Sequence, residues 1–159
     1  MNMIVGVSDM KVSNDPNSVL ITYSLGSCIG LAVYDSVARV GGILHLMLPE
    51  SGIDTAKAQK NPYMFADTGI PTLFKSAYKL GAKKQRMKTI VVGGAQVLDQ
   101  KGFFNIGKRN HLAVKKMLWK NNVIIDHEDV GGNVNRTLKL AVKNGQTWLK
   151  TSGKGEFEI

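Results

Sequence analysis

The fold is decided by residues 28–48, which run Cys-Ile-Gly-Leu-Ala-Val-Tyr-Asp-Ser-Val-Ala-Arg-Val-Gly-Gly-Ile-Leu-His-Leu-Met-Leu. Two apolar segments, 29–34 and 43–48, flank a short polar turn, which we place at residues 35–38. Each segment is apolar at both odd and even positions, so both faces of each predicted strand are apolar. A strand pair of this kind belongs in the interior of a layered fold, with another layer packed on each side.

The same hairpin predicts a pair of reactive side chains. A hairpin centred on residues 35–38 places Cys28 directly opposite His45. Opposed residues share a face of the sheet, with Cβ atoms roughly 4.5–5.5 Å apart. A thiol beside an imidazole is the arrangement that makes a nucleophile. The prediction depends on the register, because a shift of one residue would place the two side chains on opposite faces.

Each of these residues also has a purely structural interpretation. A lone cysteine is most often a small buried hydrophobic residue, and a histidine on an apolar strand is most often a hydrogen-bonded residue of the core. The preceding glycine and serine, the start of a strand and the facing His45 favour a catalytic role for Cys28. A Cys–His pair needs a third group that fixes the imidazole tautomer. The candidate is Thr22, although taken alone it is better explained as an ordinary strand threonine.

Composition sets the class of protein. A chain of 159 residues with 43% apolar and 21% charged residues predicts one globular domain over residues 1–159. No apolar stretch approaches the ~18–20 residues of a membrane helix, and the first residues lack a signal-peptide pattern. A single cysteine forms no internal disulfide, which favours a cytoplasmic location. We expect no multi-cysteine zinc site and no other metal site, because Asp126, His127 and Glu128 would alternate between opposite faces of a strand.

The net charge of +9 predicts an acidic partner, which could be a nucleic acid, an anionic membrane or an acidic protein. The basic residues are spread along the chain, and only residues 83–88 are dense in them. This segment is best explained as a solvated loop, although it and Lys108 with Arg109 are the groups expected to attract such a partner. No basic and aromatic RNA-stacking motif is present, so we expect no nucleic-acid partner.

The remaining pattern predicts the order strands, helix, strand, helix, strands. We expect helices over about 67–80 and 107–120, the first capped by Asp67 or Thr68 with Pro71 in its first turn. The Asn144-Gly145 pair indicates a hairpin. The predicted strands are 4–7, 19–23, 89–92, 123–125, 137–142 and 146–150. This order predicts an α/β layered sandwich with mixed, largely antiparallel sheets.

Several short motifs, taken in order, resemble those of the CheD family of chemotaxis proteins. They are Leu25-Gly26-Ser27-Cys28, Tyr34-Asp35, Gly41-Gly42, His45, Leu48-Pro49, Gly81-Ala82, Gly93-Gly94-Ala95, Ile106-Gly107, Arg109-Asn110, Asp129-Val130-Gly131-Gly132 and Arg136. Each motif is weak alone, but the set is specific and spans about residues 3–150. The resemblance implies an α/β sandwich similar to the catalytic domain of cytotoxic necrotizing factor deamidase toxins.

The resemblance also implies an activity and its residues. CheD proteins deamidate glutamine side chains of methyl-accepting chemotaxis receptors and bind a CheC-type phosphatase. By this resemblance Cys28 is the nucleophile, His45 the base and Thr22 the orienting residue. Backbone N–H groups around Cys28, at Gly26 and Ser27, would hold the oxyanion. No cofactor and no membrane insertion are expected, and a thiolate paired with protonated His45 would have a pKa of roughly 3.5–7.5.

Three other functions remain open. A thiol hydrolase could act on receptor methyl esters, because an ester and an amide give the same thioester intermediate. A non-catalytic adaptor could bind and regulate the phosphatase without Cys28. A basic RNA-binding module is the weakest alternative, and it predicts steeply salt-dependent binding to nucleic acid.

Overall fold

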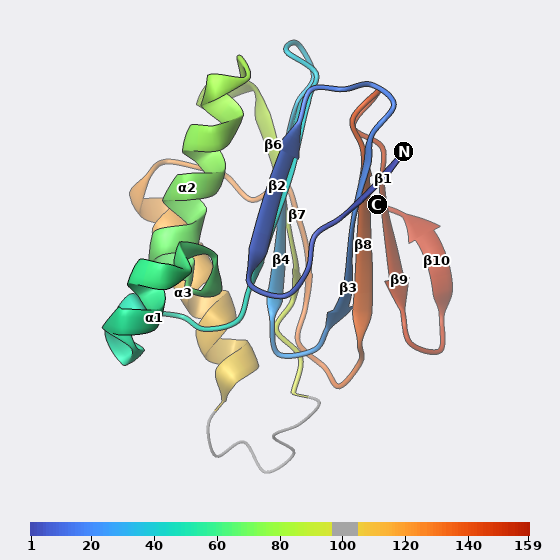
Figure 1. Cartoon of the computed structure of the whole chain (residues 1–159). Helices are drawn as coiled ribbons and strands as arrows, with labels where there is room; N and C mark the ends of the chain where they lie inside the picture. Colours follow the sequence, from blue (N-terminus) through green and yellow to red (C-terminus); the bar gives the residue numbers. More distant parts are fainter. Residues whose placement is uncertain (97–104) are drawn as a thin grey trace.

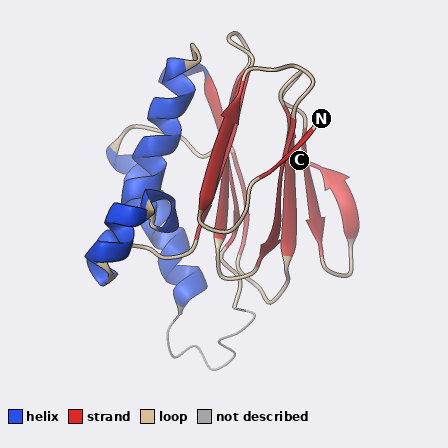
Figure 2. Cartoon of the chain, in the orientation of Figure 1, coloured by secondary structure: helices blue, strands red, loops and turns tan. Residues whose placement is uncertain are grey.

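The computed structural model describes residues 1–96 and 105–159, and it has three layers. Two five-stranded sheets pack face to face, and a layer of helices covers the far face of one of them (Figures 1 and 2). We call the sheet between the helices and the other sheet the central sheet, and the remaining one the outer sheet. This arrangement confirms the predicted α/β layered sandwich.

Each sheet draws its strands from both halves of the chain. The central sheet has the order β2-β5-β4-β6-β7, with bounds Asp9–Ser13, Val40–Leu46, Ile29–Asp35, Met87–Gly93 and His127–Val130. The outer sheet has the order β1-β3-β8-β9-β10, with bounds Asn2–Ile4, Val19–Leu25, Arg136–Ala141, Thr147–Thr151 and Gly155–Glu158. Among the strands of residues 1–96 and 105–159, the pairs β1–β3 and β6–β7 are parallel and the other pairs antiparallel, so the sheets are mixed and largely antiparallel, as predicted.

Two long helices, α2 (Ala66–Lys79) and α3 (Ile106–Lys120), form most of the helical layer. Shorter elements are α1 (Thr55–Lys60) and the 3-10 turns η1 (Ser51–Ile53), η2 (Pro62–Met64) and η3 (Lys84–Arg86). In the described part of the chain, no helix has both the length and the apolar character needed to cross a bilayer.

The central hairpin has the predicted faces. Ile29, Leu31 and Val33 of β4 pack toward the helices, whereas Ala32 and Tyr34 pack toward the outer sheet. Every residue of β4 and β5 is buried, because layers cover both faces of this strand pair. The prediction that both strands lie inside a layered fold is therefore confirmed.

The predicted register of this hairpin is wrong by two residues. Gly30, not Cys28, faces His45, and the turn occupies residues 36–39. The cause is Asp35, which is fully buried as the last residue of β4 and accepts hydrogen bonds from the backbone N–H groups of Val37 and Ala38. A shift of two residues preserves the faces, because side chains alternate with a period of two.

Several other elements differ from the predictions. Helix α2 begins at Ala66 without a side-chain cap, so Pro71 lies in its second turn. Residues 123–125 are not a strand; Val123 and Ile125 pack instead against the helix-side core, and β7 begins at His127. The first strand ends at Ile4, and the polar strands β2 and β10 had no counterpart among the predicted strands.

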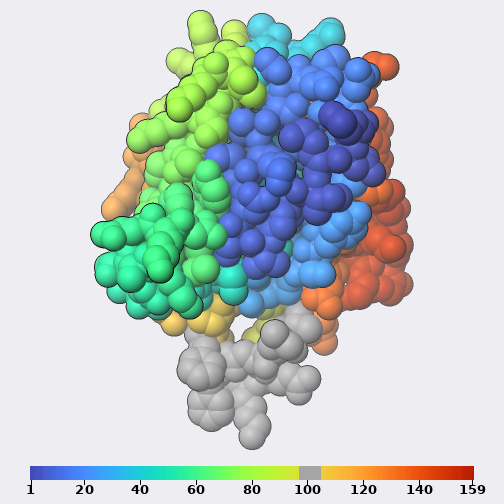
Figure 3. Space-filling model, in the orientation of Figure 1, coloured from blue at the N-terminus to red at the C-terminus, as the bar shows by residue number. Residues whose placement is uncertain are grey.

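The segment between β1 and β2 joins the two sheets at one edge. Val5 donates its backbone N–H to the carbonyl of Ile21 in the outer sheet, and Ser8 donates to the carbonyl of His45 in the central sheet. In Figure 3 this N-terminal surface, in blue, lies between the green surface of the helical layer and the red surface of the C-terminal strands. The segment therefore closes the inter-sheet space beside His45.

Asp35 is predicted to be a large contributor to stability. Burial acts to raise its pKa, but hydrogen bonds from Ala38, Lys83, Arg86 and Val37 outweigh burial, and its pKa lies below 3.8. Asp35→Ala should lower the free energy of unfolding by at least about 2 kcal/mol, because it leaves several partly buried donors without their acceptor. Urea denaturation at neutral pH measures this loss.

The matched control is Asp54→Ala, which removes an exposed helix cap at Lys57 and should cost about 1 kcal/mol. The depressed pKa of Asp35 gives stability that is present above about pH 3.8 and is lost as the pH falls further. The difference between wild type and Asp35→Ala should therefore narrow in acid. Equal losses in the two variants at neutral pH would contradict the assignment.

Candidate functional site

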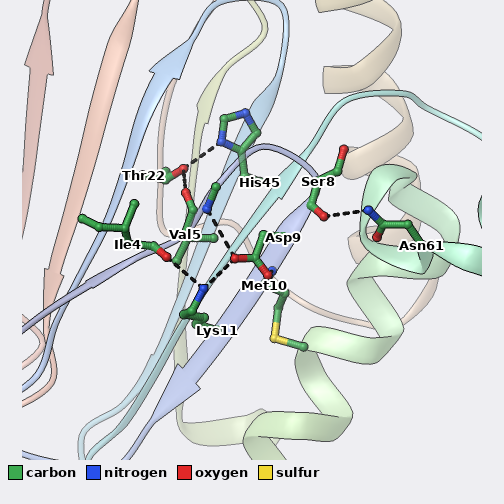
Figure 4. Close-up of polar contacts among 10 residues, drawn as sticks. Ile4, Val5, Ser8, Asp9, Met10, Lys11, Thr22, His45 and Asn61 are labelled. Atoms are coloured by element: carbon green, nitrogen blue, oxygen red, sulfur yellow. Dashed lines mark hydrogen bonds and ion pairs between the residues drawn. The ribbon is translucent and has the colours of Figure 1, made fainter.

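A hydroxyl and an imidazole meet in the space between the two sheets. The Thr22 Oγ1 atom of β3 lies 2.7 Å from the Nδ1 atom of His45 on β5 (Figure 4). The same oxygen lies 2.7 Å from the carbonyl oxygen of Val5. Thr22 and His45 are 0% and 1% exposed, so water does not compete for these bonds. The contact expected between Thr22 and His45 is present in the structure.

These two bonds fix the protonation of the imidazole. A carbonyl oxygen only accepts, so the single Thr22 hydroxyl hydrogen is donated to Val5. The Thr22 oxygen must then accept from His45, which places the proton of the neutral ring on Nδ1. The Nε2 atom carries the lone pair, and it is buried without a hydrogen-bond partner among the described residues. This atom is available as a proton acceptor.

Cys28 lies on the same side of the central sheet as His45. It is half-exposed, directly precedes β4, and packs against the core between the sheets. Since Gly30 faces His45, Cys28 is its diagonal neighbour, a position that places Cβ atoms about 7–8 Å apart. Gly30 has no side chain to stand between them. The thiol and Nε2 are near each other but are not hydrogen bonded in this structure.

The loop that carries Cys28 is anchored by the chain after β6. The backbone N–H of Gly94 donates to the carbonyl of Cys28 at 2.9 Å, and that of Ala95 donates to the carbonyl of Gly26 at 2.8 Å. A Cβ atom at Gly93 would collide with the carbonyl oxygen of Cys28. The Gly93-Gly94 pair therefore allows a close approach of backbone to the loop that carries Cys28.

Asn110 ties the same loop to the strand of His45. This residue of α3 is fully buried, and its Nδ2 group donates to the carbonyl of Ser27 at 2.9 Å and to that of Met47 at 2.8 Å. One side chain thus spans the residue before Cys28 and the residue two after His45. Sequence reasoning noted Asn110 only as part of a motif, because its bonding partners are 63 and 83 residues away.

Asp9 is a residue of the site that sequence reasoning missed. It faces His45 across the β2–β5 pair, but its carboxylate binds Lys11 Nζ at 2.6 Å and the backbone N–H of Met10 at 2.8 Å (Figure 4). Its negative charge acts on the imidazole without a direct bond. No sequence signal placed it there, since the strand β2 itself is short and polar.

The electrostatics of the site favour a neutral pair. Burial raises the pKa of the Cys28 thiol to about 11, an effect that its own backbone N–H offsets only in part. Burial lowers the pKa of His45 to about 4, which the charge of Asp9 offsets only in part. Without a contact between them, both groups are uncharged at neutral pH. The expected thiolate with a pKa of roughly 3.5–7.5 requires pairing with protonated His45 and stays a prediction.

The backbone around Cys28 offers donors for a developing oxyanion. The N–H group of Gly26 is not one of them, because it donates to the carbonyl of Ser24 at 3.1 Å. Within the described chain, the N–H groups of Ser27 and Cys28 donate to no backbone carbonyl or other residue's side chain. Of the expected pair Gly26 and Ser27, only Ser27 thus presents an available donor, and the N–H group of Cys28 interacts with its own thiol.

The two other histidines lie elsewhere. His111 of α3 lies 3.1 Å from a carboxylate oxygen of Glu128, and His127 starts the exposed edge strand β7. Over residues 1–96 and 105–159, no cluster of three or more histidine, cysteine or acidic side chains is arranged to hold a metal ion.

Comparison with known proteins gives the family. A family model described as CheD chemotactic sensory transduction matches residues 47–151. The probable chemoreceptor glutamine deamidase CheD 1 of Syntrophus aciditrophicus is 53% identical over 96% of this chain and 95% of its own length. The probable chemoreceptor glutamine deamidases CheD of Solibacter usitatus and Clostridium kluyveri are 49% and 42% identical, over 96% and 98% of this chain and 90% and 96% of their own lengths.

The chain therefore belongs to the CheD family, and the resemblance seen in its motifs is confirmed. Among solved structures, a Neisseria meningitidis protein of family model DUF152 aligns with a TM-score of 0.45 and 7% identity, over 82% of this chain and 62% of that one. The expected likeness to cytotoxic necrotizing factor toxins stays a prediction.

The pKa of His45 gives the first prediction for the site. Its ring should titrate near pH 4 with the proton of the neutral form on Nδ1. Between about pH 4 and 6.5 the unfolded chain binds more protons at this residue, so the folded state should lose stability as the pH falls across that range. Nitrogen-15 NMR of the ring measures both the tautomer and the midpoint. In Thr22→Val the Nδ1–H form should lose its preference; a midpoint near 6.5 in wild type would contradict the buried neutral ring.

The bridge made by Asn110 gives a second prediction. Asn110→Ala should lower the free energy of unfolding by at least about 2 kcal/mol, because two partly buried carbonyl oxygens lose their donor and the loop loses its tie to α3. Asn110→Asp keeps the shape but turns a carboxylate toward the same carbonyls, so it should destabilise at least as much. Urea denaturation compares the three proteins. A loss below about 0.5 kcal/mol, typical of surface substitutions, would show that the bridge is unimportant.

Proposed function

We propose that this protein hydrolyses the side-chain amide of glutamine residues in chemoreceptors, giving glutamate and ammonia. The names of its relatives support the activity. The geometry that supports the mechanism is the bond of Thr22 to Nδ1 of His45, which leaves the unprotonated Nε2 on the side of the sheet where Cys28 lies.

The first half of the reaction forms a thioester. Nε2 of His45 takes the proton of the Cys28 thiol as the sulfur attacks the amide carbonyl carbon. The carbonyl oxygen becomes an oxyanion, and the N–H group of Ser27 would stabilise it. The C–N bond then breaks, the imidazolium gives its proton to the leaving nitrogen, and ammonia departs.

The second half regenerates the thiol. Water gives a proton to Nε2 of His45 and attacks the thioester carbon. The C–S bond breaks, the sulfur recovers the proton from the imidazolium, and glutamate is released. No cofactor takes part in this sequence, and the base is needed in both halves.

Because the resting pair is neutral, the proton moves during the attack rather than before it. The imidazolium then forms in a dry site, where the Thr22 oxygen stabilises it less than a carboxylate would. The negative charge of Asp9, which acts to raise the pKa of His45, adds to that stabilisation. In apo structures catalytic hydrogen bonds are often long, so we expect substrate to bring the Cys28 sulfur onto Nε2.

The partners follow from the same proposal. The substrate is a methyl-accepting chemotaxis receptor, and a CheC-type phosphatase is the expected regulatory partner, both in the cytoplasm. An adaptor role toward the phosphatase would not need the thiol. Binding and stimulation of the phosphatase by Cys28→Ala would show that the two roles are separable.

Mass spectrometry of receptor peptides tests the proposal, because each deamidation replaces an amide NH₂ with an OH. Cys28→Ala should abolish turnover while keeping the fold, since a small apolar side chain replaces a half-buried thiol. His45→Ala should lower kcat by about 10²–10⁴-fold, the usual contribution of a general base. Thr22→Val should lower kcat less and leave measurable activity.

The double variant Cys28→Ala/His45→Ala should be no worse than Cys28→Ala alone, because members of a catalytic unit are not additive. Full turnover by Cys28→Ala would sink the mechanism. Receptors carrying methyl esters at the same positions form a further arm. Release of methanol at a rate similar to that of ammonia would extend the activity to ester hydrolysis.

A further inference from the structure

One face of α3 is exposed and entirely basic in its charge. The helix contains five lysine or arginine residues and no acidic residue. All five are exposed: Lys108, Arg109, Lys115, Lys116 and Lys120. None of them has an ion-pair partner in the described chain, whereas His111, on another side of the helix, pairs with Glu128. This side of the helical layer therefore presents unneutralised positive charge.

Two large apolar side chains lie within this basic face. Leu112 is 53% exposed and Trp119 is 79% exposed. Residues spaced three or four apart lie on the same side of a helix. One side of α3 is therefore formed by residues 108, 112, 115, 116 and 119. The buried side is formed instead by Gly107, Asn110, Val114 and Leu118. An exposed tryptophan among lysines is more typical of an interaction surface than of a solvated helix.

The N-terminal end of α3, where the basic face starts, lies against the loop that carries Cys28. Asn110 of α3 donates to the carbonyl of Ser27, and a Cβ atom at Gly107 would collide with the carbonyl oxygen of Ala95. The backbone N–H of Ala95 in turn donates to the carbonyl of Gly26, in the loop that carries Cys28. From Lys108 to Lys120 the face extends about 18 Å at the rise of an α-helix. A partner that lies along it therefore passes the site at one end.

A hollow opens in this face near the site. It has a volume of about 220 Å³ and is lined by Pro49, Glu50, Arg109, Leu112, Ala113 and Lys116. Glu50 is its one acidic residue, set against two cations. Leu112 and Ala113 give the hollow apolar surface, and Arg109 and Lys116 give it positive charge. It therefore suits a side chain with an apolar stem and an acidic end.

We propose that this exposed face of α3 is the docking surface for the substrate, an acidic helical segment that lies along α3 and presents its amide side chain to Cys28. The proposal rests on the proposed function and adds the recognition surface. Charge complementarity favours an acidic occupant, and the position of Cys28 at one end favours a protein, because a bilayer offers no amide. The basic segment 83–88 serves a different purpose: Arg86 binds buried Asp35, and Lys84 binds the carbonyl of Asn121.

Direct binding tests the surface without requiring turnover. The experiment measures the affinity of Cys28→Ala protein for an intact receptor signalling fragment, with and without Lys115→Glu/Lys116→Glu/Lys120→Glu. These residues are exposed and far along the helix from the site. The reversal should weaken binding by about 10-fold or more at low salt and flatten its salt dependence. Trp119→Ala should weaken it roughly 10-fold at any salt.

Matched variants separate docking from net charge and from helix stability. Lys57→Glu/Lys60→Glu/Lys79→Glu makes the same change in charge on exposed residues of α1 and α2, and should weaken binding far less. Glutamate near a helix C-terminus opposes the helix dipole, so Lys115→Gln/Lys116→Gln/Lys120→Gln is included. It should weaken binding by an intermediate amount.

Turnover by the enzyme with Cys28 intact gives the second readout. The α3 reversal should lower kcat/KM on the receptor fragment with little change in kcat, and should leave kcat/KM unchanged on a short uncharged glutamine peptide. Wild-type protein that binds the fragment through α3 but deamidates neither substrate would refute the proposed function while supporting the docking surface.

Three results would overturn the proposal. One is that the α1–α2 control weakens receptor binding as much as the α3 reversal does, because binding would then depend on the net charge of the protein and not on α3. Another is unchanged binding in both the α3 reversal and Trp119→Ala. The third is α3-dependent sedimentation with phosphatidylserine vesicles while receptor binding is unaffected, which would assign the face to a membrane surface.

Discussion

The hydroxyl of Thr22 is the point on which the site depends, because it joins the two sheets through a single hydrogen-bonded chain. The hydroxyl donates its one hydrogen atom to the carbonyl of Val5, so its oxygen can only accept from His45. The proton of the neutral imidazole therefore resides on Nδ1. The outer sheet supplies Thr22, the central sheet supplies His45, and the helical layer supplies Asn110, which holds the loop of Cys28. The site is therefore assembled only when all three layers are packed.

Much of the architecture could be predicted from apolar patterning, and its failures have a common physical cause. Patterning identifies a face, and both strands of the central hairpin have the predicted faces. It does not identify register, since a shift of two residues leaves every face unchanged. The register was set instead by the buried carboxylate of Asp35, which draws the turn one residue further along. Polar edge strands such as β2 and β10 have no apolar pattern to reveal them.

The sequence predicted which residues form the candidate site better than it predicted their protonation states. Cys28 and His45 do share a face, and Thr22 does contact the ring, although the pair is diagonal rather than opposed. The charge state was not predictable, because it depends on how deeply the layers bury both groups. Asp9 was missed, and Asn110 was noted only as part of a motif, because their partners lie far away in sequence.

The raised pKa of the Cys28 thiol also affects how readily the protein is damaged by oxidants and electrophiles. Oxidants and adventitious electrophiles react with thiolates and scarcely with thiols. A chain with a single cysteine has no second thiol to repair or replace the first by internal exchange. By keeping that sulfur protonated at neutral pH, the fold protects the single thiol of the chain from chemical damage.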